Sequence, residues 1–314
     1  MSKYIFKNTI SSGGNMEGIN YYIKIGPYIK ELREKNNMTK SQLADGICSI
    51  SYITRIENGE RCPTSVILRQ ITNKLGITPE YLFRAIESPT SLQVKDLLDQ
   101  IFTDIEKHNF KNIYKLIIKK EKELDIRSIH DMQIIETFKC ISTTFLNENY
   151  HWGMDEVKNI LAPTYIEGSN PTDIEFMLLF SYGCFLLLSD QQEKAYAYLK
   201  NIEKYLDNIQ FLHTRVLFPA FYIFLIAACL DTSNFKEASL YLNATIDYCK
   251  KYNTYSYLRE LYFLKSELFD HLNNDKEFTI WYNKALMLHE LIKNSDDEYF
   301  DVFIKNRLKK LKTS

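Results

Sequence analysis

Residues 39–63 read TKSQLADGICSISYITRIENGERCP, and this stretch decides the fold of the amino-terminal part of the chain. Thr39 is followed three residues later by Gln42, a capping box that predicts the start of a helix. Residues 46–48 leave room only for a tight turn. A second helix is expected to begin at about Ser49. Two short helices joined in this way predict a helix-turn-helix motif.

The second helix of this motif has two different faces. Ile53 and Ile56 fall on its inner face at helical spacing. Its outer face carries side chains that can contact base edges and phosphates in a major groove, so the motif predicts DNA binding. Ile50 stands out there, because exposing an apolar residue is favourable only if it meets a thymine methyl; the alternative is that it packs into the turn. The expected DNA-binding residues are Ser49, Ile50, Ser51, Tyr52 and Arg55, with Lys40 and Arg61 as phosphate contacts.

The segments around the motif predict three more helices. One covers residues 25–33, a second covers residues 65–75 and ends at Gly76, and a short third one follows Thr78-Pro79-Glu80. Apolar residues at helical spacing mark the inner faces of the first two. These residues are Ile25, Ile29, Leu32, Val66, Leu68, Ile71 and Leu75.

This order of helices resembles the Xre/lambda-repressor-like DNA-binding domain. The residues that carry the resemblance are Arg33, Gln42, Leu43, Ala44, Ile53, Ile56, Glu57, Gly59, Pro63, Leu75, Gly76 and Ile77. It implies a partly buried ion pair between Arg33 and Glu57. The turn is one residue shorter than in common members, and here the sequence resembles the PlcR/Rgg-like (RRNPP) regulators, quorum-sensing proteins of Gram-positive bacteria that respond to peptides. In that group a long array of helical repeats follows the DNA-binding domain.

Length and charge support a division into two domains. A chain of 314 residues is long enough for about two domains. We expect a disordered tail over residues 1–23, a helix-turn-helix domain over 24–87 and a repeat domain over 88–314. Residues 1–86 hold 12 Lys and Arg against 7 Asp and Glu, a net charge of +5, whereas residues 87–314 hold 27 against 33, a net charge of −6. A basic first domain suits contact with DNA, although chance scatter of charge is an alternative.

Helical periodicity continues through the second domain, and alternating strand patterns are absent, so the predicted fold class is all-α. The expected helical hairpins are 91–107 with 110–125, 129–149 with 152–162, 172–189 with 191–207, 213–231 with 234–252, and 255–273 with 275–293, followed by a last helix over 296–312. Arg307 and the lysines around it suit the carboxyl end of that last helix. The spacing of apolar residues in the later hairpins resembles degenerate tetratricopeptide repeats. This resemblance implies a right-handed superhelix whose first helices line a concave groove.

We expect the groove to hold a short, largely apolar peptide. Its lining is counted from Gly183 and Ser266, small residues at which first helices would approach closely. Aromatic and Met side chains would give adaptable apolar pockets, and two glutamates could accept the amino terminus or a basic side chain of the peptide. The expected lining is Met177, Phe180, Cys184, Phe221, Phe224, Glu260, Phe263 and Glu267. The alternatives are that the apolar residues form core between repeats and that the glutamates lie on a solvated face.

Several other classes of protein receive no support. Residues 176–188 and 216–230 are strongly apolar but shorter than the roughly 18–20 residues that cross a bilayer, so we expect buried helices and no membrane contact. The six cysteines show no C-x-x-C pairing and are interpreted as reduced residues in or near the core of a cytoplasmic protein. No catalytic motif, metal-ligand pattern or phosphate-binding loop is present, so no enzyme activity, metal or cofactor is expected.

Three functions are compatible with the sequence. The first is a cytoplasmic transcriptional regulator that binds an operator as a homodimer, with residues 91–107 and the last repeats in the dimer contact, and that senses a signalling peptide. In the second, the repeats serve only protein-partner binding or dimerisation. The third is a repeat scaffold resembling Rap proteins, with a vestigial helix-turn-helix. The intact capping box and the polar outer face of the second helix argue against the third.

Overall fold

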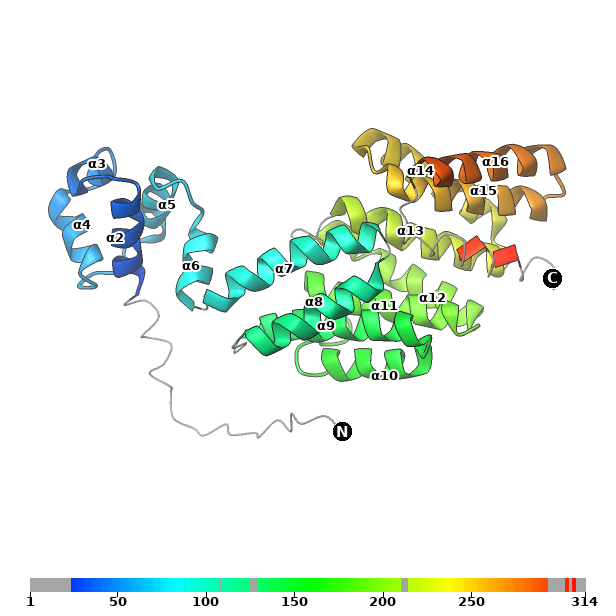
Figure 1. Ribbon diagram of the computed structural model, residues 1–314, viewed down its shortest axis with the longest axis horizontal. Coiled ribbons are helices and arrows are strands. Elements are labelled where there is room, and N and C mark those ends of the chain that lie inside the picture. Colours follow the sequence, from blue (N-terminus) through cyan, green and yellow to red (C-terminus); the bar gives the residue numbers. More distant parts are fainter. Residues whose placement is uncertain are drawn as a thin grey trace. The chain divides into compact units, whose positions relative to one another are not determined.

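A computed structural model describes residues 24–292, except 88, 108, 125–128 and 210–213, together with residues 303–304 and 307–308 (Figure 1). The chain divides into two compact units between Gln93 and Val94. The regular elements in the described residues are all helices, which confirms the predicted all-α class. The expected disordered tail lies outside the described residues, as does most of the expected last helix.

Between residues 24 and 87, the described part of the first unit forms the five α-helices that the sequence predicts. Their bounds are Ile25–Lys35 for α2, Lys40–Ala44 for α3, Ile50–Glu57 for α4, Ser65–Lys74 for α5 and Pro79–Glu87 for α6. Thr39 and Gln42 form the expected capping box: the Thr39 hydroxyl accepts from the Gln42 amide, and the Gln42 side chain accepts from the Thr39 amide at 2.8 Å. Ser49 caps α4 by accepting a hydrogen bond from the Tyr52 amide.

The core of this unit follows the predicted apolar faces with one exception. Leu68, Ile71 and Leu75 of the third predicted segment are buried, but Val66 is 66% exposed. Val66 lies two residues before Leu68, about 200° away around the helix, and so cannot share its face. Gly26 of α2 meets α4 so closely that a Cβ there would lie 1.8 Å from the Ile56 carbonyl oxygen.

A buried ion pair joins the same two helices. Arg33 donates from Nε to Glu57 Oε1 at 2.6 Å and from Nη2 to Glu57 Oε2 at 3.1 Å. Its Nη1 donates to the Met38 carbonyl at 2.8 Å, which fixes the segment before α3. The Glu57 side chain is fully buried. The hydrogen bond to Glu57 raises the pKa of the Arg33 guanidinium above the usual value.

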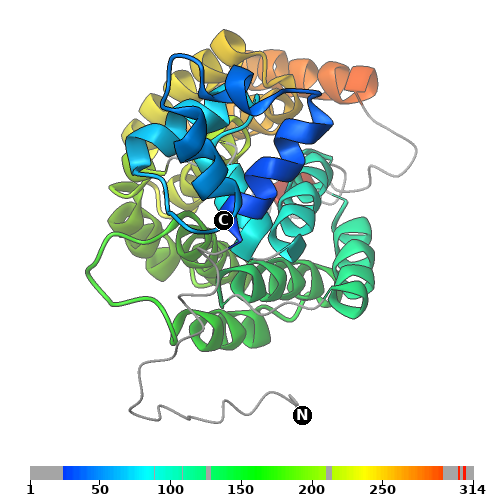
Figure 2. The same cartoon turned by 90° about the vertical axis from the view of Figure 1, so that its left-hand side faces the viewer.

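The second unit contains the ten hairpin helices that the sequence predicts, with ends shifted by a few residues. Their bounds are Pro89–Glu106 for α7, which begins before the division between the units, Phe110–Glu123 for α8, Ile129–Asn147 for α9, Tyr150–Leu161 for α10, Asp173–Leu188 for α11, Gln192–Glu203 for α12, Thr214–Asp231 for α13, Phe235–Tyr252 for α14, Leu258–His271 for α15 and Asp275–Ile292 for α16. In both views the hairpins follow one another from the green helices α9 and α10 to the orange helix α16 (Figures 1 and 2).

Packing between first helices makes the hairpins one continuous array. Helix α11 contacts α9 and α13, and α13 contacts α15. Almost every residue of α11 from Ile174 to Leu187 is buried, as is most of the described part of α13. The two apolar stretches in the sequence are therefore the middle of a helical stack. Within the residues that the structure describes, no helix is both long and apolar enough to cross a membrane.

The turns inside the hairpins explain why glycine is scarce in this part of the chain. Glu148, Asp190, Ser233 and Asn273 lie between the two helices of the second to fifth hairpins, and each has a positive φ of 51–59°. Such residues end a helix in the left-handed region, which usually favours Gly but tolerates Asn and Asp. The chain therefore reverses direction without the glycines that would make the turns easy to recognise.

Close approach at Gly183 occurs within a hairpin and not between first helices, as the sequence analysis assumed. A Cβ on Gly183 would lie 2.5 Å from Leu199 Cδ2 of α12, the partner helix in the same hairpin. The groove lining on α11 was counted from Gly183 on the assumption that another first helix lies there. Because α12 lies there instead, Gly183 does not locate the side of α11 that faces a groove.

We predict that removing the charge of Glu57 destabilises the first unit, because Glu57→Gln leaves the buried Arg33 guanidinium without its anion. The expected loss is about 3–5 kcal/mol in the free energy of unfolding, measured by urea denaturation. The control is Glu31→Gln: Glu31 pairs with Lys35 at 2.7 Å, but both side chains are more than half exposed, so a loss below about 1 kcal/mol is expected. Equal unfolding midpoints for the two variants would contradict the role given to the Arg33–Glu57 pair.

Candidate nucleic-acid interface and peptide site

The outer face of α4 is open to solvent. Ile50 is 51% exposed, so it does not pack into the preceding turn. Ser51 and Arg55 are exposed on the same side of the helix, and the hydroxyls of Ser49 and Ser51 lie 3.0 Å apart. The face thus combines hydroxyl, guanidinium and methyl groups, which can distinguish base pairs in a major groove.

Tyr52 and Arg61 form the edge of this face. The Tyr52 ring is half-buried against the core of the first unit. The Arg61 guanidinium lies over it, 5.1 Å from the ring centroid, which orients an otherwise mobile cation. Tyr52 is therefore more of a support for Arg61 than an exposed base contact.

Two of the predicted cations also contact acidic residues. Arg55 Nε lies 3.9 Å from Glu60 Oε2, and both side chains are about half exposed, so this contact is weak and leaves the guanidinium accessible. Lys40 Nζ lies 3.8 Å from Oε2 of the buried Glu57. Lys40 is the first residue of α3, and its ammonium group adds positive charge beside the Arg33–Glu57 pair.

The residues predicted to line the peptide groove on α11 and α13 are brought together, but they are not open. The Phe180 ring lies 5.4 Å from Phe221 and 5.8 Å from Phe224, centroid to centroid. Met177 and Cys184 are buried on α11, and only Phe224 is partly exposed. These side chains fill the space between the two helices, which is the alternative that the sequence analysis left open for them.

The glutamates predicted for the groove are buried too, so neither lies on a solvated face. Glu260 Oε1 accepts from Arg259 Nε at 2.8 Å. Arg307 donates to both carboxylate oxygens of Glu267, with Nε 3.0 Å from Oε2, and its Nη1 lies 2.8 Å from Asp231 Oδ1. Burying a charged carboxylate is costly without a partner, and Arg307 supplies one here. From the sequence, Arg307 was expected only to suit the carboxyl end of the last helix.

Phe263 is also covered by the chain's own carboxyl-terminal residues. Its ring lies 5.8 Å from that of Phe303, and Ile304 joins the same apolar cluster. The part of α15 predicted to face a peptide is therefore occupied, in this conformation, by residues 303–308 as far as they are described.

A polar network that the sequence did not reveal joins the third and fourth hairpins. Lys200 Nζ lies 2.8 Å from Glu203 and 2.9 Å from Glu237, and it also donates to the Tyr241 hydroxyl. Tyr196 donates to Glu237 at 2.6 Å, and this bond to a carboxylate raises the pKa of Tyr196 to about 12. Residues Lys200 and Tyr241 are 41 positions apart, so only repeat register could have paired them. The network holds α12 against α14.

The described residues contain no candidate metal site, and their cysteines are not paired. No group of His, Cys, Asp and Glu there could hold a metal ion. All six cysteines are free thiols, and Cys140, Cys184, Cys229 and Cys249 are buried. Burial raises the pKa of Cys140 and Cys229 to about 12, which keeps both thiols protonated. Cys62 is an exception to the predicted core placement, because it is exposed.

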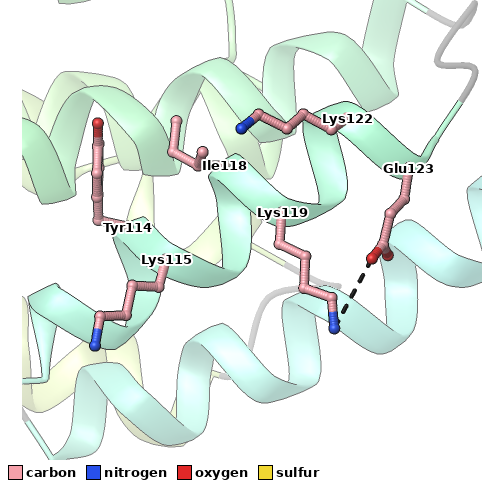
Figure 3. Close-up of a pocket in the computed structure, with 6 residues that line it drawn as sticks. All are labelled: Tyr114, Lys115, Ile118, Lys119, Lys122 and Glu123. Atoms are coloured by element: carbon pink, nitrogen blue, oxygen red, sulfur yellow. Dashed lines mark ion pairs between the residues drawn. The ribbon is translucent and has the colours of Figure 1, made fainter.

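An open hollow lies on the surface of α8 (Figure 3). It has a volume of about 420 Å³ and is lined by Tyr114, Lys115, Ile118, Lys119, Lys122 and Glu123. The helical spacing of the lysines in α8 is a sequence signal that could have indicated this hollow.

Part of the chain matches a known family, and most of the chain is similar to solved structures. The Helix-turn-helix family model matches residues 29–82. The structure is similar to that of PlcR from Bacillus thuringiensis in complex with the peptide PapR7 and DNA, with a TM-score of 0.74, 19% identity and coverage of 92% of this chain and 98% of that chain. No curated protein sequence matches the chain significantly.

Two further solved structures share the arrangement. ComR from S. thermophilus, in complex with DNA and its signalling peptide ComS, has a TM-score of 0.60 and 18% identity, and 90% of this chain and 99% of that chain are covered. The SHP pheromone receptor Rgg2 of Streptococcus dysgalactiae has a TM-score of 0.52 and 14% identity, covering 92% and 99%. Residues 29–82 thus form a helix-turn-helix domain, and the chain as a whole has the same fold as PlcR, ComR and Rgg2.

Proposed function

We propose that this chain is a transcriptional regulator that reads duplex DNA with α4 and is controlled by a short signalling peptide bound to its repeat domain. The observation that carries the first part is the outer face of α4, on which Ile50 and Arg55 are exposed on a helix capped by Ser49. The second part is supported by the shared fold of PlcR, solved with the peptide PapR7 and DNA, and of ComR, solved with DNA and its signalling peptide.

In this proposal the residues of α4 divide into two roles. Ser49, Ser51 and Arg55 contact base edges, and Ile50 meets a thymine methyl. Tyr52 holds Arg61 in place, and Arg61 and Lys40 contact phosphates. Phosphate contacts set affinity and its dependence on salt, whereas base contacts set sequence preference.

The proposed peptide site centres on the aromatic cluster of Phe180, Phe221 and Phe224. Because Phe224 is its partly exposed member, a peptide would enter there and displace ring contacts that the free protein makes with itself. Met177 and Cys184 would adapt to the bound side chains. Phe263, Glu260 and Glu267 belong to the proposal only as a second step. Arg259 binds Glu260, Arg307 binds Glu267, and Phe303 contacts Phe263.

An exposed apolar stripe on α16 favours self-association as a second function of the repeats. Ile280, Met287 and Leu291 lie on one side of this helix, and Met287 and Leu291 are 68% and 76% exposed. We propose that the stripe is part of a homodimer contact, since a single helix-turn-helix domain covers too little DNA for tight specific binding. If the repeats bind no peptide, dimerisation or partner binding is the remaining role.

Ile50→Ser is predicted to change sequence preference. Sites selected by the wild-type protein from a random duplex library should lose on the order of 1 kcal/mol of binding free energy relative to random DNA. Lys40→Ala should instead weaken all duplexes alike and reduce the salt dependence. The measurement is fluorescence anisotropy on selected and random duplexes. Equal losses on both duplexes for Ile50→Ser would remove Ile50 from base recognition.

Loss of the aromatic cluster is predicted to weaken peptide binding. Synthetic peptides encoded by small open reading frames beside the gene are titrated calorimetrically into the wild type and into Phe180→Leu/Phe224→Leu. A loss of affinity on the order of tenfold or more is expected in the double variant. The matched control is Phe218→Leu/Phe235→Leu, since these rings stack on Tyr248 and His271 and make no ring contact with Phe180 or Phe224. Equal affinities for both double variants would place the peptide elsewhere.

Introducing negative charge into the apolar stripe on α16 is predicted to disrupt self-association. Met287→Glu/Leu291→Glu should sediment as a monomer at concentrations where the wild type is a dimer, because two carboxylates cannot be buried unpaired. Leu240→Glu is the control, since Leu240 is 72% exposed on α14 and outside the stripe. A wild-type chain that sediments as a monomer both free and on DNA would refute the dimer itself.

A further inference from the structure

Helix α8 carries four lysines along one face. Lys111, Lys115, Lys119 and Lys122 follow one another at intervals of four, four and three residues, so their side chains leave the helix within one narrow arc. All four are exposed. We call them the α8 lysine stripe. It lies in the part of the chain whose net charge is −6, so it concentrates positive charge where the average is negative.

Most of the charge of the stripe is uncompensated. Lys119 lies 3.8 Å from Glu123, but Glu123 is also held by Lys120 at 3.1 Å. The other acidic residue of α8, Glu121, accepts from Lys139 of α9 at 2.7 Å. Among the described residues, no carboxylate lies within ion-pair distance of Lys111, Lys115 or Lys122. Among the described residues, the acidic side chains of this helix therefore offset the charge of Lys119 only in part, and they leave Lys111, Lys115 and Lys122 available to an external anion.

The hollow on α8 gives the stripe a defined shape. Tyr114, Ile118 and Lys122 form one row along the helix, and Lys115, Lys119 and Glu123 form the next (Figure 3). The space between them is open to solvent. Lysine and tyrosine side chains are common donors to DNA phosphates, and Ile118 offers an apolar surface to a sugar ring.

We propose that the α8 lysine stripe is a second DNA contact, which binds phosphates of the duplex outside the base pairs read by α4. This inference rests on the proposed DNA-binding function and extends it to the repeat domain. From Lys111 to Lys122 the helix rises about 16 Å, which equals the axial rise of roughly five base pairs, so the stripe is long enough to reach more than one phosphate. An acidic repeat domain is repelled by DNA, and a lysine stripe on its second helix offsets that repulsion without reading sequence.

The test measures DNA affinity of the full chain as a function of salt. A random duplex of roughly 40 base pairs is titrated between about 50 and 200 mM salt with the wild type and with Lys111→Gln/Lys115→Gln/Lys122→Gln. Each lost phosphate contact lowers the slope of log affinity against log salt by about 0.9, so the triple variant should lose between about 2 and 3. Thermal melting followed by circular dichroism verifies that the variant folds.

The matched control is Lys236→Gln/Lys250→Gln/Lys276→Gln, which removes the same charge from exposed positions on α14 and α16. Its slope should stay close to that of the wild type. Equal slopes for the two triple variants would overturn the inference. If the wild type binds the duplex and Arg55→Ala weakens it while the stripe variant does not, the DNA-binding function stands and only the stripe fails.

Two further outcomes would assign the stripe to another partner and so overturn the proposal. The first is binding to phosphatidylserine vesicles that depends on the stripe while the DNA slope is unchanged. The second is loss of self-association in the stripe variant by sedimentation, again with an unchanged DNA slope. If the wild type fails to bind the duplex at about 50 mM salt, both the stripe contact and the DNA-binding function are refuted.

Discussion

Glu57 is fully buried in the first unit, where Arg33 donates to both of its carboxylate oxygens. This pairing links α2 to α4, two helices that also approach closely where Gly26 meets the Ile56 carbonyl. The same arginine fixes the Met38 carbonyl ahead of α3. The position of the α4 outer face, and with it any contact with DNA, therefore depends on keeping a buried charge paired.

The same constraint acts in the repeat domain, where it changes the meaning of the candidate groove. Glu267 and Asp231 are bound by Arg307, which comes from the end of the chain. A peptide that used Glu267 would have to release Arg307 and leave it without its anion. The aromatic cluster on α11 and α13 has no such cost, because exchanging one apolar contact for another leaves no charge unpaired. This difference is why the proposed peptide site centres on Phe180 and Phe224.

Charge is distributed along the chain in a way that fits two DNA contacts of different kinds. The α4 face combines few cations with groups that can discriminate bases, whereas the α8 lysine stripe has cations and little else. A contact of the first kind gives specificity, and one of the second kind gives affinity that falls with salt. The polar network around Lys200 shows the opposite use of a lysine, because two carboxylates of the repeat domain already bind it.

The sequence by itself determined the helices and their order. The capping box at Thr39 and Gln42, the stop at Gly76 and the apolar spacing of the later hairpins are local signals, since each depends on residues within one or two helical turns. These signals were sufficient to predict the helix-turn-helix domain and the five hairpins, which form the fold that this chain shares with PlcR and ComR.

Only the tertiary structure decided which side chains are accessible. Periodicity placed Phe180, Phe263 and Glu267 on one side of their helices. It could not show that a neighbouring helix, Phe303 and Arg307 cover that side. Gly183 likewise marked a close approach without identifying Leu199 as the neighbour. Burial and charge pairing depend on residues tens of positions apart, and a helical pattern carries no information about the partner helix that a face meets.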